Sequence, residues 1–148
     1  MQALLQRVRH AEVVVDGEPG PGGRIGAGLL VFLGLEPDDD RATGRRLLQR
    51  VLDYRVFADD TGRMNRSLRD SGGGLLLISQ FTLAADTSRG LRPGFSTAMA
   101  PEPAGALFGE LFADLQALHS PVAGGRFGAD MQVSLCNDGP VTFLLRSR

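Results

Sequence analysis

Two short segments of the sequence combine residue types that can take part in chemistry. Ser79-Gln80-Phe81-Thr82-Leu83 presents two hydroxyls, an amide and an aromatic ring directly after an apolar run. Asn137-Asp138-Gly139-Pro140-Val141-Thr142 places a proline, which has no N–H to donate, between two strand-like stretches. Each pattern alone is more often structural. The first is then a strand end with Phe81 in the core, and the second is a tight turn with a bond that can be cis at Gly139-Pro140.

Other candidate motifs favour structural interpretations. Asp70-Ser71-Gly72-Gly73 resembles a serine-protease nucleophile segment, but the chain is too short for two barrels and has no matching histidine motif. Gly94-Phe95-Ser96-Thr97-Ala98 resembles a nucleophile elbow without the apolar strand that must precede one. The glycines between Gly20 and Gly28 lack dinucleotide-binding spacing and precede a strand. We expect neither His10 nor His119 to be catalytic, since a helix C-terminus favours a histidine at position 119.

Composition narrows the function classes. The chain has 148 residues, 43% hydrophobic and 22% charged, which predicts one soluble domain spanning residues 1–148. All sixteen basic residues are arginine, which excludes lysine chemistry such as Schiff bases. The formal net charge of −1 argues against a large nucleic-acid footprint. With only Cys136 and two histidines, we expect no disulfide, metal or cofactor.

No apolar run approaches the roughly 20 residues of a membrane helix, and the first residues lack the apolar stretch of a signal peptide. We therefore expect a cytoplasmic protein that does not bind membranes.

Hydrophobic periodicity predicts the elements that must position the two segments. Two amphipathic helices are expected, one after Pro37-Asp38-Asp39-Asp40 through about Tyr54 and one over 103–118. Strands are expected over 3–16 (one strand or two), 28–34, 75–78, 131–136 and 141–145, with a loop at 19–23 and a proline turn at 137–140.

This order of elements favours a mixed sheet with helices on one side over a doubly wound parallel sheet. The expected fold class is α/β. Mixed and antiparallel β-sheets form a barrel-like β/β/α layering, with two main helices packed on one side.

Six segments in order resemble the D-aminoacyl-tRNA deacylase family, and the likeness runs from end to end. They are Ala3-Leu4-Leu5-Gln6-Arg7-Val8, Met64-Asn65-Arg66-Ser67-Leu68, Ser79-Gln80-Phe81-Thr82-Leu83, Arg92-Pro93, Gly125-Arg126-Phe127-Gly128-Ala129-Asp130-Met131 and Asn137-Asp138-Gly139-Pro140-Val141-Thr142. The chain departs from the family pattern in two places. The loop 84–91 lacks a tyrosine and a lysine expected there, and Gly94 stands where serine is usual.

The resemblance implies a homodimer that hydrolyses the ester joining a D-amino acid, or glycine mischarged on tRNA-Ala, to the 3′ end of tRNA. It implies that Ser79, Gln80, Phe81 and Thr82 form the catalytic pocket. It also implies that Gly139 and Pro140 of the partner subunit select chirality: their carbonyls accept hydrogen bonds from the substrate ammonium, and an L side chain clashes with the backbone. Further residues implied in substrate binding or selection are Arg7, Phe127, Met131 and Asn137.

The residue types suggest how such a site works. Backbone N–H groups near Phe81 and Thr82 can stabilise an oxyanion, and the substrate 2′-hydroxyl can activate water. Thr82 lacks an identifiable base, so a positioning role is favoured over a nucleophilic one. Phe127 or Phe81 can stack on the terminal adenine. Arg7 is expected to brace the opposite subunit's Gly139-Pro140. The candidate phosphate contacts are Arg89, Arg92 and Arg126.

Two alternatives remain open. One is a non-catalytic dimeric module that binds tRNA 3′ ends or adenine nucleotides, and the other is a small serine hydrolase acting through Ser71 or Ser96. Neither DNA nor a membrane is an expected partner.

Overall fold

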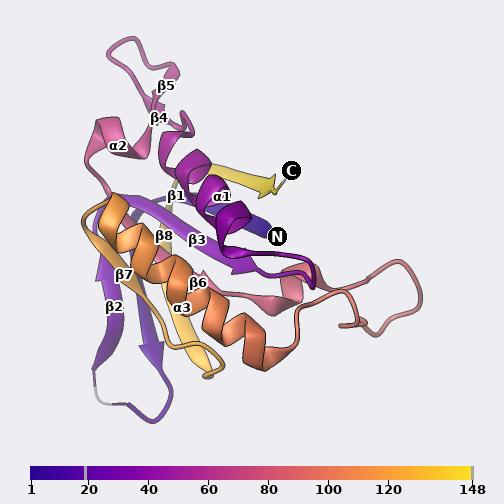
Figure 1. Cartoon of the computed structure of the whole chain (residues 1–148). Helices are drawn as coiled ribbons and strands as arrows, with labels where there is room; N and C mark the ends of the chain where they lie inside the picture. Colours follow the sequence, from indigo (N-terminus) through magenta and orange to yellow (C-terminus); the bar gives the residue numbers. More distant parts are fainter. Residues whose placement is uncertain (19, 148) are drawn as a thin grey trace.

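The computed structural model describes residues 1–18 and 20–147. Figure 1 shows a curled sheet with helices laid across one face. Pro19, in the expected loop, lies outside the described residues. The strands are β1 (Gln2–Val15), β2 (Pro21–Ile25), β3 (Gly28–Gly34), β4 (Phe57–Ala58), β5 (Met64–Arg66), β6 (Gly74–Ser79), β7 (Val122–Gly124) and β8 (Met131–Arg146). The helices are α1 (Arg41–Asp53), α2 (Leu68–Ser71), the 3₁₀ helix η1 (Phe81–Ala84) and α3 (Pro101–Leu118).

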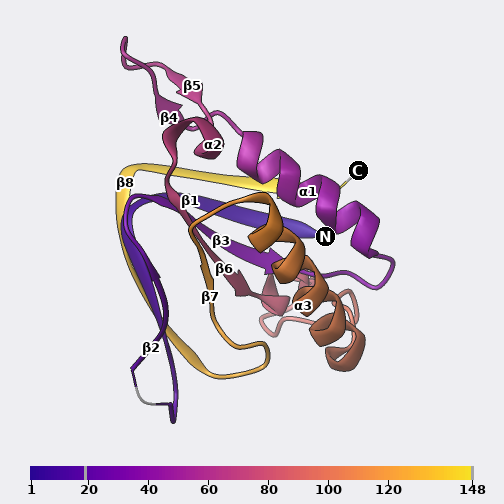
Figure 2. The same cartoon turned by 60° about the vertical axis from the view of Figure 1, so that its left-hand side comes forward.

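The long strand β1 organises the main sheet, whose order is β2-β1-β3-β6-β7 with β8 also on β1. The first half of β1 pairs with β3, its second half pairs with β2, and β8 pairs along the whole strand, all antiparallel. Strands β3, β6 and β7 run parallel. Figure 2 shows β8 bending alongside β1 over its length. A separate two-stranded sheet joins β4 and β5.

The two long helices form where the periodicity predicts them. Asp40 caps α1 by accepting the Thr43 N–H at 2.7 Å. Helix α3 begins at Pro101, two residues before the predicted start. A proline is tolerated in the first turn because N–H groups there form no intrahelical hydrogen bond, so the missing N–H costs none. No helix in the described ranges is long and apolar enough to cross a membrane.

Apolar side chains fill both faces of the sheet. One cluster joins the sheet to α1 and α3. The other draws only on strands, including Val13, Leu30 and Leu76, so the curl of the sheet encloses it. Strand β2 comes so near β7 that a Cβ added to Gly23 would lie 2.8 Å from the Gly124 carbonyl oxygen. This near closure confirms the predicted α/β, barrel-like layering with helices on one side.

Part of the predicted loop at 19–23 is wrong. Pro21 pairs with Val14 and Gly23 with Val13, so this stretch begins β2. A proline is tolerated there because it is the first residue of an edge strand, and the register shifts between Val13 and Val14.

The predicted pair of strands around a proline turn is one continuous strand. In β8, Asn137 pairs with Val8 and Thr142 with Gln6, so residues 138–141 bulge opposite Arg7 alone. The chain does not reverse, because β1 is long enough to pair with both halves of β8. The Gly139–Pro140 bond inside this bulge is cis, the form that the sequence allowed for. The name "β8 bulge" is used below for residues 138–141.

Candidate active site

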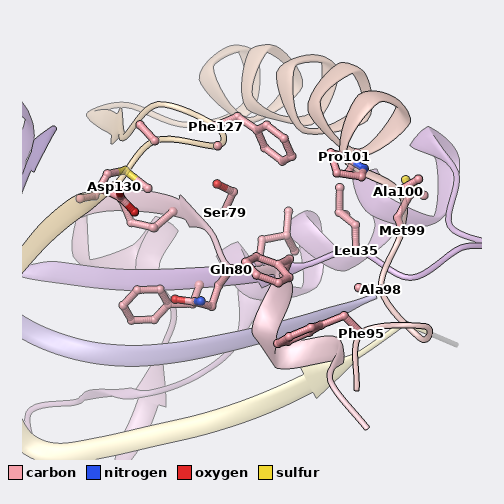
Figure 3. Close-up of a pocket in the computed structure, with 18 of the residues that line it drawn as sticks. Leu35, Ser79, Gln80, Phe95, Ala98, Met99, Ala100, Pro101, Phe127 and Asp130 are labelled. Carbon is pink, nitrogen blue, oxygen red and sulfur yellow. The ribbon is translucent and has the colours of Figure 1, made fainter. Parts of the chain in front are cut away.

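A cavity of about 670 Å³ lies where the parallel strands β3 and β6 end. Its wall combines four separate segments: the end of β3 with Leu35, the residues from Ile78 to Phe81, the loop that leads into α3, and residues 127–131 with Val133. Figure 3 shows these segments surrounding one opening beside α3. The volume is that of a site for a small organic group.

Strand pairing positions the first candidate segment. Ser79 pairs with Leu33 at the end of β6, and the Gln80 N–H donates to the Leu33 carbonyl at 2.8 Å. The chain then turns into η1, whose Leu83 N–H returns to the Gln80 carbonyl at 3.2 Å. In Figure 3 the Ser79 side chain projects into the cavity. The backbone thus changes direction at the cavity wall.

The start of η1 offers backbone donors. The i to i+3 pattern of a 3₁₀ helix gives no intrahelical acceptor to the Phe81 and Thr82 N–H groups, and no side chain caps this end. Thr82 itself does not line the cavity. Its exposed hydroxyl accepts a hydrogen bond from Gln80 Nε2 at 2.6 Å.

Aromatic rings border the cavity, two of them exposed to solvent and one packed against α3. Phe81 is 56% exposed and Phe95 is 43% exposed, with ring centroids 5.1 Å apart. The interpretation of Phe81 as a core residue is therefore wrong. Phe127 instead packs on α3, 5.9 Å from the Phe108 ring and close to Gly105. One aromatic surface is free at the cavity, and another is anchored to the core.

Ordinary acid–base groups are scarce around the cavity. Among the described residues that line it, Asp130 is the only charged one, and none is a histidine or cysteine. The described residues also contain no cluster of three histidine, cysteine or acidic side chains placed to hold a metal ion. The groups available in the cavity are the Asp130 carboxylate, the Ser79 hydroxyl, the Gln80 amide and the backbone at the start of η1.

The second candidate segment lies elsewhere in the chain. Arg7 Nε donates to the Asp138 carbonyl at 3.0 Å and lies 3.2 Å from the Asp138 carboxylate, while its Nη1 donates to the Val56 carbonyl. Gly139 has φ +130°, a region that disfavours side chains. Gly139 and Pro140 are exposed. Arg7 therefore braces the β8 bulge of its own chain, and its expected contact with the bulge of the opposite subunit stays a prediction.

The structure therefore divides the predicted site residues into two groups. It brings together at the cavity Ser79, Gln80, Phe81, Phe127 and Met131. It leaves outside the cavity Thr82, Arg7, Asn137, Gly139 and Pro140. From Met131 to Gly139 an extended strand spans roughly 26 Å, so the β8 bulge does not reach the cavity of its own chain.

Sequence reasoning missed the wall formed by the loop before α3. Phe95, Met99 and Pro101 line the cavity. The Met99 N–H donates to the Leu35 carbonyl at 3.0 Å, which holds this loop against β3. The loop has no hydrophobic period, so the only signal was the pair of prolines at the start of α3.

Three other residues singled out in the sequence have structural partners. The His119 ring hydrogen-bonds the Gly73 carbonyl at 2.7 Å, and the Ser71 hydroxyl donates to the Leu68 carbonyl at 3.0 Å. Arg126, one of the candidate phosphate contacts, forms an ion pair with Glu18. Ser71, His119 and Arg126 do not line the cavity.

Comparison with known proteins identifies relatives over almost the whole chain. Curated proteins named D-aminoacyl-tRNA deacylase are 59% identical in Stutzerimonas stutzeri and 60% identical in Azotobacter vinelandii, each alignment covering 99% of this chain and 100% of the relative. Among solved structures, one described as "c-Myc DNA Unwinding Element Binding Protein" is 36% identical with TM-score 0.92, over 100% of this chain and 99% of that one.

A second solved structure, described as a probable eukaryotic D-amino acid tRNA deacylase, is only 16% identical but shares the fold, with TM-score 0.87 over 97% of both chains. The family described as D-Tyr-tRNA(Tyr) deacylase matches residues 4–146. The chain therefore belongs to the D-Tyr-tRNA(Tyr) deacylase family.

Proposed function

We propose that the protein hydrolyses the ester of D-aminoacyl-tRNA, releasing the D-amino acid and free tRNA. Membership of the deacylase family makes the chain a hydrolase of this class. The observation that carries the chemistry is the cavity at the end of β6, where the Ser79 hydroxyl, the Gln80 amide and the start of the uncapped helix η1 at Phe81 line one opening. An aminoacyl ester is labile enough to need oxyanion stabilisation more than a strong base.

Water is the nucleophile in this mechanism. The Phe81 and Thr82 N–H groups stabilise the negative charge that develops on the ester carbonyl oxygen, an effect worth about 10²–10³ per donor in other hydrolases. The attacking water gives a proton to the substrate's 2′-hydroxyl, which passes its own proton to the departing 3′-oxygen. The bond between the acyl carbon and that oxygen breaks, the amino acid leaves with the second oxygen from water, and the 2′-hydroxyl is restored. Thr82 positions Gln80 through their hydrogen bond and forms no covalent bond with substrate.

The free aromatic surface suits the terminal adenine. Phe81 is exposed beside Phe95, and a base can stack on its ring at no cost in charge desolvation. The cavity behind it then receives the ribose and the ester. Phe127, packed against Phe108, is less free to act as the stacking surface and instead forms the wall on the α3 side.

Chirality is selected by the β8 bulge of a second copy of the chain. Its backbone is exposed and Arg7 braces it, but it does not line the cavity of its own chain. Its carbonyls, entering a partner's cavity, accept the substrate ammonium, so a D side chain points outward and an L side chain meets the backbone. Glycine has no side chain to reject, so glycyl-tRNA is also cleaved.

A homodimer follows from this arrangement. Phe143 and Leu144, just beyond the β8 bulge, are 37% and 44% exposed, which leaves apolar surface next to the bulge for a partner to cover. Each chain acts as one domain over residues 1–148, and the protein works in the cytoplasm, where aminoacyl-tRNA is found.

The proposal is tested by incubating the protein with D-tyrosyl-, L-tyrosyl- and glycyl-tRNA and following the loss of each ester. The D and glycyl esters should disappear while the L ester persists at its spontaneous rate. Equal rates for the D and L esters would contradict the selector. A module that only binds tRNA would retain all three esters, which would contradict hydrolysis itself.

A further inference from the structure

A second groove lies between α1 and the end of β8, which run side by side in both views (Figures 1 and 2). Its volume is about 240 Å³, smaller and more open than the cavity described above. Three guanidinium groups, two hydroxyls and one leucine line it: Thr43, Arg46, Leu47, Arg50, Arg146 and Ser147. No carboxylate is among these described lining residues. The name "arginine groove" is used below for this set.

The three arginines of the groove make no ion pair within the described residues. Arg41 and Arg45, on the same helix, both pair with Asp114. Arg46 instead donates to the Thr43 hydroxyl at 2.9 Å, and Arg50 donates to the Arg146 carbonyl at 3.3 Å. These contacts position the guanidinium groups without neutralising them.

The nearest carboxylates are engaged elsewhere. Asp40 accepts the Thr43 N–H at the start of α1, at 2.7 Å. Glu36 accepts from the Met1 amine and from Gln2 at 2.9 Å. Arg46 and Arg50 stand one helical turn apart, where like charges repel each other. Three positive charges therefore gather beside a hydroxyl-lined groove. They form no ion pair within the described residues, although Asp40 lies near Arg46 and Glu36 near Arg146.

We propose that the arginine groove binds phosphate groups of the RNA backbone in the tRNA substrate. Guanidinium forks match phosphate oxygens, and the two hydroxyls add donors. The two positions on α1 are separated by about 6 Å along the helix axis, so they present an extended row of donors rather than one closed pocket. With a net charge of −1, the chain can attract an anion only through such a local patch.

The groove lies near the active-site cavity. Leu35 lines the cavity, the next residue Glu36 bonds the Met1 amine, and that amine donates to the Ser147 hydroxyl at 3.0 Å. A tRNA whose 3′ end occupies the cavity can therefore lay its adjoining backbone along α1. This inference rests on the proposed function for the identity of the RNA.

The test measures binding of deacylated tRNA to the full chain over a range of salt concentrations. The variant Arg46→Gln/Arg50→Gln/Arg146→Gln should weaken binding and lower the slope of log affinity against log salt by about 3, one unit per lost phosphate contact. Arg24→Gln/Arg55→Gln/Arg63→Gln removes the same charge away from the groove and should leave the slope near that of the wild type. The triple lysine variant of the groove should keep most of the slope.

An unchanged slope in the glutamine variant of the groove, or an equal loss in the matched control, would overturn the inference. Because Arg50 also contacts the Arg146 carbonyl and lies 5.9 Å from the Tyr54 ring, Arg46→Gln alone provides a second variant with less structural risk. It should lower the slope by about 1.

A short substrate separates this inference from the proposed function. Hydrolysis of D-tyrosyl-adenosine, which has no RNA backbone, should be as fast in the groove variant as in the wild type. A wild type that binds tRNA through the groove but cleaves no D ester would refute the proposed function alone. A wild type that cleaves the D ester, with a groove variant that keeps full tRNA affinity, would refute the groove alone.

Discussion

At the residue scale, the surroundings of the Thr82 and Ser79 hydroxyls determine whether either can act as a nucleophile. The Thr82 hydroxyl is exposed, lies outside the cavity wall and receives a hydrogen bond from an amide, which is not a base. The Ser79 hydroxyl enters the cavity, but no histidine lies among the described residues that line it. Both hydroxyls are therefore suited to hydrogen bonding rather than to covalent attack.

Replacing Thr82 by valine should lower kcat for D-aminoacyl-tRNA by less than about 10²-fold, because only a positioning contact to Gln80 is lost. Loss of a true nucleophile costs about 10⁴–10⁶-fold in enzymes that use one. Single-turnover rates for wild type, Thr82→Val and Thr82→Ser distinguish the two cases. A trapped acyl group on Thr82 would refute the positioning role.

At the scale of elements, α1 and α3 are joined by ion pairs from Arg41 and Arg45 to Asp114 and by one close approach. Arg41 contacts both oxygens of the buried Asp114 at 2.9 and 2.8 Å. Where the helices touch, a Cβ on Gly44 would lie 2.5 Å from Leu111 Cδ2, and Leu111 is fully buried. The pair of helices anchors Phe127 and so supports one wall of the cavity.

Gly44→Ala should destabilise the protein by about 1–2 kcal/mol, because overpacking against Leu111 outweighs the gain in helix propensity. Gly109→Ala is the matched control on α3, where an added Cβ meets nothing within 4 Å. It should stabilise the protein by about 0.5–1 kcal/mol. Urea unfolding measures both changes, and a stabilising Gly44→Ala would show that the helices are not in tight contact.

The hydrogen bonds from Arg41 hold the pKa of Asp114 below its ordinary value of 3.8. A carboxyl with a depressed pKa in the folded state adds stability above its unfolded pKa, and this contribution is lost as pH falls through the folded pKa. The difference in unfolding free energy between wild type and Asp114→Asn should therefore be largest near neutral pH and shrink below pH 3.8.

Urea unfolding at several pH values provides this measurement. Asp38→Asn is a suitable control, because Asp38 is exposed and makes no ion pair in the described chain. A gap between wild type and Asp114→Asn that stays constant across this pH range would contradict the assignment.

The elements that sequence patterns predict are those set by local periodicity. Leu47, Leu48 and Val51 repeat at helical spacing. The short apolar run of β3 lies between two glycines, and that of β6 follows three glycines. The continuity of β8 escapes prediction because it depends on pairing with β1, which is distant in sequence. Strand β2 escapes prediction because its proline and glycines indicate a loop, and only pairing with β1 makes the stretch a strand. The same holds for the site: Ser79 to Phe81 are locally visible, whereas Phe95 and Met99 reach the cavity only through tertiary contacts.

At the scale of the whole molecule, the two groups of predicted site residues are apart in one chain, and the proposed dimer reunites them. Gly139→Ala should disturb the β8 bulge, since the new Cβ would lie 2.8 Å from Val141 Cγ2 at a φ of +130°. Ser79→Leu should fill the cavity. Each homodimer should then be inactive against D-aminoacyl-tRNA.

A heterodimer with one Gly139→Ala chain and one Ser79→Leu chain holds one intact cavity facing one intact bulge. Purified with two affinity tags, it should recover about half of the wild-type activity, because one of two symmetric sites is whole. The Gly139→Ala/Ser79→Leu double variant paired with wild type is the matched control and should be inactive, since each of its sites has one defect. No recovery in the first heterodimer would place the whole site within one subunit.

Strand β8 contributes Met131 and Val133 to the cavity and then carries Gly139 and Pro140 toward the opposite end of the molecule. The number of residues between Val133 and Gly139 fixes the distance between the cavity and the β8 bulge. Adding or deleting one residue there would turn alternate side chains over and change the reach of the bulge at the same time. The exposed turn near Gly62 does not connect two parts of the proposed site, so an insertion there should change activity less. Tolerance to insertions should thus differ sharply between two surface-accessible stretches of the same chain.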